Sequence, residues 1–225
     1  FGDTVGSPIR FKENGINFEA NVLSGQKTGF FLDQRDNRQH IRLLSKGKSV
    51  LNVFSYTGAF SVYAFAGGAR SVLEIDSNSI VLSASKKNLK LNFPNRNFSL
   101  EEFKQIKADG FGALLELKSN KQKFDLVILD PPAFARRNKQ TKNALNAYAK
   151  LVEAGAKVTV KGGILFAASC SVHVKAPNFY TAVFSGIQSA RREYKELCRT
   201  GHAKDHPAIF GGGEYLKGVF CRITN

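Results

Sequence analysis

Residues 124–134 of the chain read FDLVILDPPAF, in which an apolar run, 126–129, stops abruptly at Asp130. Such a run predicts a strand covered on both faces, because a strand with one solvent-exposed face would alternate apolar and polar residues. The two prolines that follow remove two backbone donors, so the chain cannot continue the hydrogen-bond ladder. We therefore predict a buried strand at 124–130 whose carboxyl end presents Asp130 and, after the turn, Phe134.

Other apolar segments on both sides of this strand extend the pattern. We expect strands at 49–55, 71–76, 102–109 and 162–169, with helical segments between most of them. This alternation predicts an α/β fold, a doubly wound, Rossmann-like and mostly parallel sheet with helices on both faces. Two more strands, at 196–203 and 215–223, are joined through FGGGEY, a link too short for a parallel crossover. We therefore expect a seven-stranded sheet with an antiparallel last strand.

The N-terminal part of the chain has a different pattern of apolar and polar residues. Residues 9–22, IRFKENGINFEANV, alternate apolar and polar side chains around Asn14-Gly15, a pair that tolerates the positive φ angles of a type I′ turn. This predicts a β-hairpin, and a helix is expected from about Asp36 to Ser45. We expect residues 1–25 to form a hairpin and linker extension, and residues 26–225 to form the main domain.

The composition is strongly basic, with 33 Lys and Arg against 18 Asp and Glu, a net charge of +15. This balance favours a polyanionic partner, nucleic acid before an anionic membrane surface, although a merely soluble basic surface is the simpler alternative. Because no apolar run has the length of a membrane helix and no signal peptide opens the chain, we expect a cytoplasmic protein without a membrane partner. The absence of Met indicates a piece of a longer protein.

Polar residues follow the predicted strands at the edge where open parallel sheets bind ligands. SYTGAF (55–60) places Gly58 where the backbone can turn sharply toward a ligand, but it departs from the G-x-G-x-x-G fingerprint of dinucleotide-binding proteins. Asp76 ends the next strand, where we expect its carboxylate to bind the two hydroxyls of a ribose; capping of the following helix is the alternative, and one carboxylate can serve both roles. Asp109 has the same ambiguity.

Asp130 and Phe134 suit a flat base that is stacked and hydrogen-bonded along its edge. The structural alternative is a plain strand that ends in proline. Four cations follow, and they either track a phosphate backbone or belong to a solvated loop. These cations are Arg136, Arg137, Lys139 and Lys142.

Four ordered motifs together carry a family resemblance. They are GQKTGFFLDQRDNR (25–38), VLNVFSYTGAFSVYAFAGGA (50–69), FDLVILDPPAFAR (124–136) and GGILFAASCS (162–171). The chain resembles, from about Phe11 to Ile223, the class I S-adenosylmethionine-dependent methyltransferases of large-subunit ribosomal RNA, specifically the branch that makes 5-methylcytosine. That branch usually carries an N-terminal PUA-type RNA-binding domain, which this chain lacks.

The resemblance implies S-adenosyl-L-methionine as cofactor, ribosomal RNA as partner and residues 26–225 as the catalytic domain. It places Asp76 at the cofactor's ribose and Asp109 near the adenine, and Asp130 is expected to contact the cofactor as well as the base. It also implies that Gln34 and Arg35 close over the cofactor. The residues implied along the methionine part are Ser55, Tyr56, Thr57 and Gly58. We expect no metal, and a homodimer is a further expectation.

Cys170 is the candidate nucleophile. The C5 carbon of cytosine is a poor nucleophile, and addition of a thiolate to C6 turns the ring into an enamine that can attack a methyl group. Cys170 follows the strand predicted at 162–169, next to Asp130 and Phe134, in an electropositive chain that favours the thiolate. Taken alone, a cysteine at a strand end is more often buried filler. Cys198 and Cys221 fall in the C-terminal strands, and we interpret both as core or incidental residues.

Three alternatives stay open at this point. Asp-Pro-Pro-aromatic also resembles the motif of enzymes that methylate ring or exocyclic nitrogens, which need no cysteine. A methyltransferase-like fold could serve only as an RNA-binding module, without binding the cofactor. An NAD oxidoreductase is the most distant alternative, because the glycine fingerprint is missing.

Overall fold

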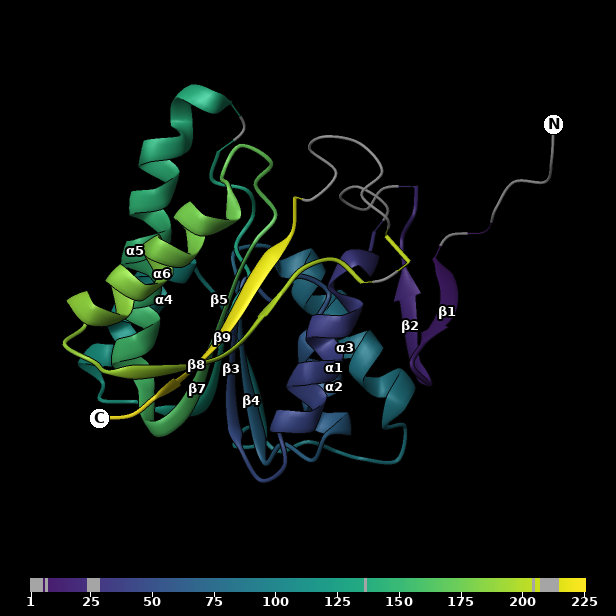
Figure 1. The fold of residues 1–225 in the computed structure, drawn as a ribbon. Helices are drawn as coiled ribbons and strands as arrows, with labels where there is room; N and C mark the ends of the chain where they lie inside the picture. The colour runs from purple at the N-terminus through teal and green to yellow at the C-terminus, as the bar shows by residue number, and fades with distance from the viewer. Residues whose placement is uncertain (1–5, 7, 24–28, 136, 204, 207–214) are drawn as a thin grey trace, which may run out of the picture.

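The computed structural model describes residues 6, 8–23, 29–135, 137–203, 205–206 and 215–225. In them a seven-stranded sheet has the order β5-β4-β3-β6-β7-β9-β8 (Figure 1). The strands are β3 (Ser49–Val53), β4 (Ser71–Asp76), β5 (Phe103–Lys107), β6 (Phe124–Leu129), β7 (Thr159–Ser169), β8 (Tyr194–Thr200) and β9 (Lys217–Ile223). Neighbours from β5 to β7 are parallel, whereas β9 is antiparallel to both β7 and β8. The predicted fold class and the antiparallel last strand are confirmed.

The strand β7 begins earlier than the sequence suggests. We expected it from Gly162, but it starts at Thr159, and its register with β6 shifts between Phe124 and Leu126. Gly162 has φ +78°, a left-handed conformation inside the strand. Glycine ordinarily weakens a strand, and here it accompanies an irregularity that the periodicity does not predict. The loop expected at FGGGEY lies outside the described residues except for Tyr215.

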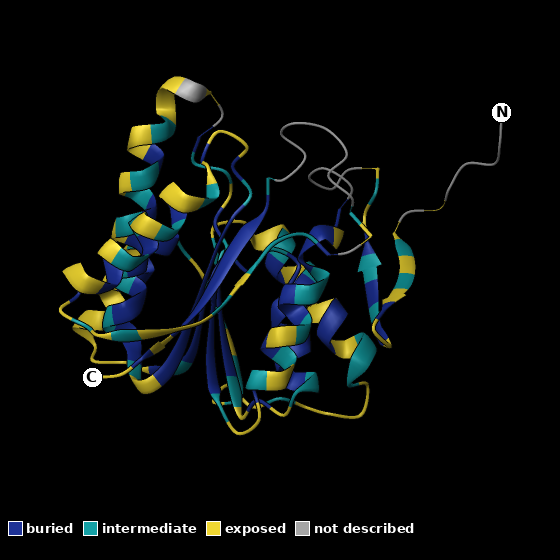
Figure 2. Cartoon of the chain, in the orientation of Figure 1, coloured by how far each residue is buried: buried dark blue, intermediate teal, exposed yellow. Residues whose placement is uncertain are grey.

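Helices cover both faces of the sheet, as predicted. One layer holds α1 (Arg35–Leu44), α2 (Ala59–Ala66) and α3 (Ser79–Asn92), and the other holds α4 (Gly110–Ser119), α5 (Thr141–Val158) and α6 (Ala176–Ser189) (Figure 1). Short 3₁₀ segments, η1 (Leu32–Gln34) and η2 (Asn138–Gln140), precede α1 and α5. The strands between the layers are mostly buried, and the helices expose their outer faces (Figure 2). In the described ranges no helix is long and apolar enough to cross a membrane.

Alternate residues of the central strands pack into two hydrophobic cores, one on each face of the sheet. Leu51 and Val53 pack in the core beneath α4, α5 and α6, while Val50 packs in the core beneath α1 and α2. All five residues of β3 are buried, because both of its faces are covered. The sheet edge at the carboxyl ends of β3, β4, β6 and β7 is therefore held rigidly, and it carries the candidate site.

The predicted hairpin forms from β1 (Ile9–Glu13) and β2 (Ile16–Ala20). Asn14 and Gly15 have φ +49° and +79°, as a type I′ turn requires. Side chains of α3 complete the backbone hydrogen bonds of β2. Asn92 accepts from the Asn17 amide at 2.8 Å and donates to its carbonyl at 2.7 Å. The hairpin is thus fastened to the α/β domain through its own backbone.

A buried ion pair fastens the hairpin a second time. The guanidinium of Arg38 on α1 donates to both carboxylate oxygens of Glu13 at 2.7 and 2.6 Å, and the two side chains are 2% and 4% exposed. The hydroxyl of Tyr63 on α2 donates to the same carboxylate at 2.9 Å. Burial raises the pKa of Tyr63, and the Glu13 charge acts in the same direction. A helix layer and the hairpin therefore share one polar network inside the core.

Candidate active site

The loop between β3 and α2 has an unusual backbone. Phe54, Tyr56 and Gly58 adopt left-handed φ angles of +62°, +48° and +74°. The first two are not glycine, and such conformations cost about 1–3 kcal/mol each unless the surroundings impose them. The loop is held by the Ser55 amide, which donates to the Ile75 carbonyl at 3.1 Å, and by the Gly58 amide, which donates to the Ser55 carbonyl at 2.9 Å. Strain at this loop is typical of a ligand-binding turn.

Gly58 is required by packing as well as by φ. A Cβ atom at this position would lie 1.9 Å from the Ser85 hydroxyl and 2.8 Å from Oε1 of Glu74. The Ser85 hydroxyl donates to Glu74 at 2.7 Å, and the Gln105 amide donates to it at 2.7 Å. Burial raises the pKa of the Glu74 carboxyl. Sequence reasoning missed this network, although a Glu inside the apolar run SVLEID was a visible signal.

Asp76 holds the loop and does not cap the helix. Its Oδ2 accepts from the Tyr56 amide at 2.9 Å and its Oδ1 from the Asn78 amide at 2.9 Å. The N-cap of α3 is Asn78, whose side chain accepts from the Ile80 amide, so the interpretation of Asp76 as that cap is wrong. A carboxylate has about four acceptor positions, so Asp76 can accept further hydrogen bonds from hydroxyls.

Two buried hydroxyl groups in the same loop can form further hydrogen bonds. Among the described residues Ser55 Oγ and Thr57 Oγ1 are buried without a hydrogen-bond partner. Buried polar groups are ordinarily satisfied, and an exception at a strained loop indicates a polar ligand. Together with the Asp76 carboxylate they form a donor and acceptor set that fits a polar cofactor carrying a ribose.

Asp109 caps the helix that follows it, which is one of the two roles that the sequence left open. It is the N-cap of α4, and its Oδ2 accepts from the Gly112 amide at 2.9 Å. The preceding residue, Ala108, donates to the Asp76 carbonyl at 3.1 Å, so Asp109 lies beside the end of β4. Its second carboxylate oxygen can still contact a ligand at that edge.

A hydrogen bond from a residue near the N-terminus orients the Asp130 carboxylate. The side-chain amide of Gln34, which is 3% exposed, donates to Asp130 Oδ1 at 2.9 Å. Asn37 donates in turn to Gln34 Oε1 at 2.6 Å. The neighbouring Arg35 points elsewhere, because its guanidinium pairs with Asp36 at 3.2 Å and with Asp205. The structure therefore brings Gln34 to the Asp130 carboxylate and Arg35 to the C-terminal segment.

The loops after β6 and β7 are joined. Ser171 Oγ donates to the Ala135 carbonyl at 2.9 Å and accepts from its amide at 3.2 Å. The centroid of the Phe134 ring lies 4.7 Å from the centroid of the Tyr148 ring on α5. The Tyr148 hydroxyl accepts from Ser169 Oγ at 2.8 Å. The two strand ends that carry Asp130 and Cys170 are thereby fixed relative to each other.

Cys170 is partly exposed at the end of β7, between two buried serines. Tyr148 and Tyr215 both interact electrostatically with it, and burial raises the pKa of each tyrosine to about 12. Lys217, at the start of β9, donates to the Ser171 carbonyl and also interacts with Cys170. Sequence reasoning missed Lys217 and Tyr215, although a lysine inside the apolar run YLKGVF was a visible signal.

The other two cysteines differ from Cys170. Cys221 is buried in the middle of β9, opposite Leu165, and burial raises the pKa of its thiol to about 12. Burial also raises the pKa of Cys198 on β8. Neither strand position lies at the edge that carries Asp130, which agrees with their interpretation as core or incidental residues.

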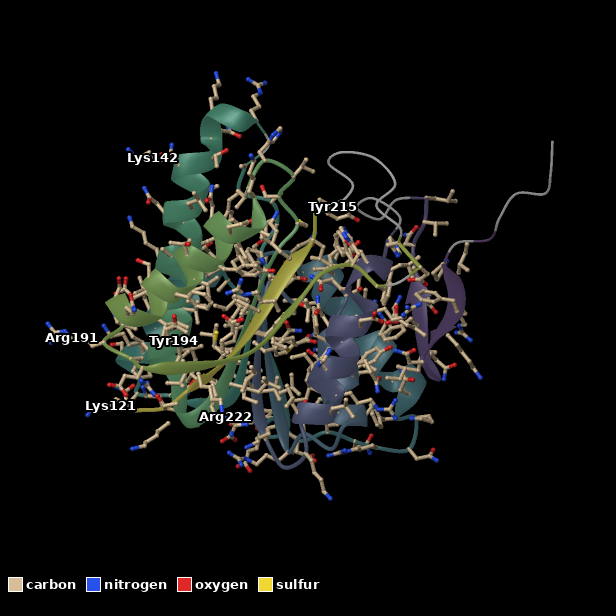
Figure 3. The ribbon with its side chains drawn as sticks, viewed as in Figure 1. Lys121, Lys142, Arg191, Tyr194, Tyr215 and Arg222 are labelled. Carbon is tan, nitrogen blue, oxygen red and sulfur yellow. The ribbon has the colours of Figure 1, made fainter. Side chains whose placement is uncertain are left out.

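The expected cations lie on one side of this edge. Arg137 precedes η2, Lys139 lies in it and Lys142 lies at the start of α5; all three are exposed, whereas Arg136 lies outside the described residues. Lys142 and Tyr215 lie toward the same end of the molecule, and Lys121, Arg191 and Arg222 lie toward the opposite end (Figure 3). Across the described residues no group of three or more His, Cys, Asp or Glu side chains is arranged to hold a metal ion.

The chain is similar to proteins of known name. The chain is 44% identical over 223 residues to a protein of Deinococcus radiodurans named ribosomal RNA large subunit methyltransferase, covering 99% of this chain and 54% of that protein. It is 37% identical to ribosomal RNA large subunit methyltransferase I of Aliivibrio fischeri, covering 99% and 56%. The chain thus spans about half the length of these relatives.

A solved structure has the same architecture. The crystal structure of SMU.776 complexed with SAH superposes with a TM-score of 0.86 at 26% identity, over 99% of this chain and 57% of that one. The family model described as S-adenosylmethionine-dependent methyltransferase matches residues 6–191. With its fold and this match in agreement, the chain belongs to the S-adenosylmethionine-dependent methyltransferase family.

Proposed function

We propose that this chain transfers a methyl group from S-adenosylmethionine to C5 of a cytosine in large-subunit ribosomal RNA, through a covalent adduct of Cys170. The names of the relatives from Deinococcus radiodurans and Aliivibrio fischeri support the RNA substrate. The net charge of +15 supports a polyanionic partner.

In this proposal the strained loop and its neighbours hold the cofactor. Asp76 accepts hydrogen bonds from the ribose hydroxyls, and Asp109 lies near the adenine. Gln34 closes the site from the N-terminal side, whereas Arg35, paired with Asp36 and Asp205, takes no part in this closure. The residues along the methionine part are Ser55, Tyr56, Thr57 and Gly58. The buried unpartnered hydroxyls of Ser55 and Thr57 support this assignment. When bound, the cofactor supplies an electrophilic methyl group.

The observation that carries the reaction is that Cys170 and Asp130 follow neighbouring strands at one edge of the sheet. Their strands, β6 and β7, are parallel neighbours, and both side chains interact electrostatically with Tyr148. The thiolate of Cys170 adds to C6 of the base, which forms an S–C6 bond and makes C5 nucleophilic. After C5 takes the methyl group, which leaves S-adenosylhomocysteine, a base removes the C5 proton and the S–C6 bond breaks, so that the product and the thiolate are released.

Asp130 and Phe134 position the base. Asp130, oriented by Gln34, holds the Watson–Crick edge and assists protonation at N3. Phe134 shapes the pocket from its position against Tyr148. The cations Arg136, Arg137, Lys139 and Lys142 contact the RNA backbone in this proposal.

A trapping assay tests the proposal. RNA that carries 5-fluorocytidine should form a stable adduct with the wild type in the presence of S-adenosylmethionine, because fluorine at C5 prevents the final loss of a proton. The Cys170→Ala variant should form none, while the matched control Cys198→Ala should form as much as the wild type. Peptide mass analysis should locate the adduct at Cys170.

The alternatives predict other results. If Cys170→Ala still methylates natural RNA and no adduct forms with the wild type, the enzyme methylates a nitrogen without a cysteine nucleophile. If calorimetry detects RNA binding but no binding of S-adenosylmethionine, the chain is an RNA-binding module. Either result contradicts the proposed reaction.

A further inference from the structure

Lys217 is a buried lysine, and buried lysines are rare in proteins. It begins β9, pairs across the sheet with Ser169 of β7, and is 3% exposed. In the described ranges it is the one lysine among the buried residues. Lysine is almost never fully buried without a partner, so this position calls for a physical reason.

The contacts of Lys217 supply no opposite formal charge. Its Nζ donates to the carbonyl oxygen of Ser171 and, at 3.0 Å, to that of Tyr215. An ammonium has three N–H donors, so one is left beyond these two bonds. The buried Arg38 is different, because Glu13 compensates its charge. No ion pair joins Lys217 to a carboxylate of the described residues.

Cys170 interacts with this ammonium. Burial lowers the pKa of Lys217 to about 8, and the charge of Cys170 acts in the opposite direction. Such an interaction is mutual, so the ammonium favours the thiolate of Cys170 by the same amount. Tyr148 and Tyr215 also interact electrostatically with Cys170, and both stay neutral near neutral pH because burial raises their pKa values to about 12. Of these three groups, Lys217 carries the positive charge.

The turn that presents Cys170 depends on the same side chain. Ser169 and Ser171 are both buried, and Lys217 lies opposite the first and donates to the carbonyl of the second. Cys170 is the more exposed residue between them. The lysine is therefore buried beside the turn that carries the thiol.

We propose that Lys217 is a positioning residue whose buried ammonium holds the Ser169–Ser171 turn and stabilises the thiolate of Cys170. The inference rests on the proposed function, in which that thiolate is the nucleophile. The thiol proton goes to solvent, and Lys217 keeps its own protons and forms no bond to the substrate. Strand β9 thus contributes to the reaction through a residue that stabilises the nucleophile and does not contact the substrate.

Thiol alkylation across a pH range tests the inference without RNA or cofactor. Iodoacetamide modification of Cys170 in the full chain is followed by peptide mass analysis for the wild type and Lys217→Met. Near pH 7 the variant should react about tenfold more slowly, the change expected when a thiol pKa rises by about one. Near pH 10 the two rates should converge, because both thiols are then ionised.

Controls separate charge from access. Lys175→Met removes an exposed lysine five residues from Cys170 and should leave the pH profile unchanged. Cys198 is an internal reference in every sample. Lys217→Gln, which keeps a polar head without charge, runs beside Lys217→Met so that the comparison does not depend on one folded variant.

Two results would overturn the inference. One is a Lys217→Met rate equal to the wild type near pH 7, and the other is a rate lowered by the same factor at both pH values, which indicates changed access. The 5-fluorocytidine assay with the wild type reports separately on the proposed function. An adduct with an unchanged alkylation profile refutes the role of Lys217 alone, whereas the expected profile without an adduct refutes the proposed reaction alone.

Discussion

Gly58 and Gly15 offer a matched test of the reasoning about the β3–α2 loop. Both have left-handed backbones, with φ +74° and +79°. A Cβ added at Gly15 meets nothing within 4 Å, whereas one at Gly58 lies 1.9 Å from Ser85 Oγ. The variants Gly58→Ala and Gly15→Ala therefore share the cost of backbone strain and differ in steric conflict.

The expected magnitudes follow from these contacts. An alanine in the left-handed region costs about 1–2 kcal/mol at either position. At Gly58 the conflict adds about 1–3 kcal/mol for overpacking. Displacing Ser85 also breaks its hydrogen bond to the buried Glu74, which costs about 1–3 kcal/mol more. We expect Gly58→Ala to lose about 4 kcal/mol of stability and Gly15→Ala about 1 kcal/mol.

Urea denaturation followed by circular dichroism measures the two free energies of unfolding. Calorimetric titration with S-adenosylmethionine measures binding, and Gly58→Ala should bind at least about tenfold more weakly than Gly15→Ala, since a loop shift costing about 1.4 kcal/mol at the cofactor has that effect. Losses of stability within about 0.5 kcal/mol of each other would refute the steric argument. Equal affinities would refute the assignment of this loop to the cofactor.

Three further predictions concern charged groups elsewhere in the chain. Arg38→Met should destabilise the fold by about 3 kcal/mol in urea titrations, because it leaves the Glu13 carboxylate buried without its cation; a loss below about 1 kcal/mol would show that the pair does not fasten the hairpin. Burial lowers the pKa of Lys217 to about 8, so above that pH the folded chain releases a proton that the unfolded chain holds until about 10.4. The free energy of unfolding of the wild type, measured relative to Lys217→Met, should thus be constant below about pH 8 and rise by about 3 kcal/mol by about pH 10.5, and a flat difference would contradict the burial of a charged lysine. Lys142→Ala should reduce the salt slope of RNA binding by about one, whereas Arg222→Ala, toward the opposite end of the molecule (Figure 3), should leave it unchanged; equal slopes for both variants would place the RNA elsewhere.

The sequence by itself determined the architecture and the positions of the strand ends. Apolar runs such as 124–129 mark strands covered on both faces, and Asn14-Gly15 marks a turn that needs two positive φ angles. These signals are local, because backbone conformation and side-chain periodicity act over a few residues. The order of the candidate residues at the sheet edge, Gly58, Asp76 and Asp130, followed from the same local signals.

Only the tertiary structure decided which side chains meet at that edge. Gln34 reaches Asp130 across 96 positions of the chain, and Lys217 reaches the carbonyl of Ser171 across 46. The second contact exists because β9 inserts between β7 and β8, an order that no short stretch of sequence encodes. Local chemistry fixes where a strand begins and ends, whereas its neighbours follow from how the two cores pack against the whole sheet. The buried lysine behind Cys170 is therefore visible as an oddity in the sequence and acquires a role only in the fold.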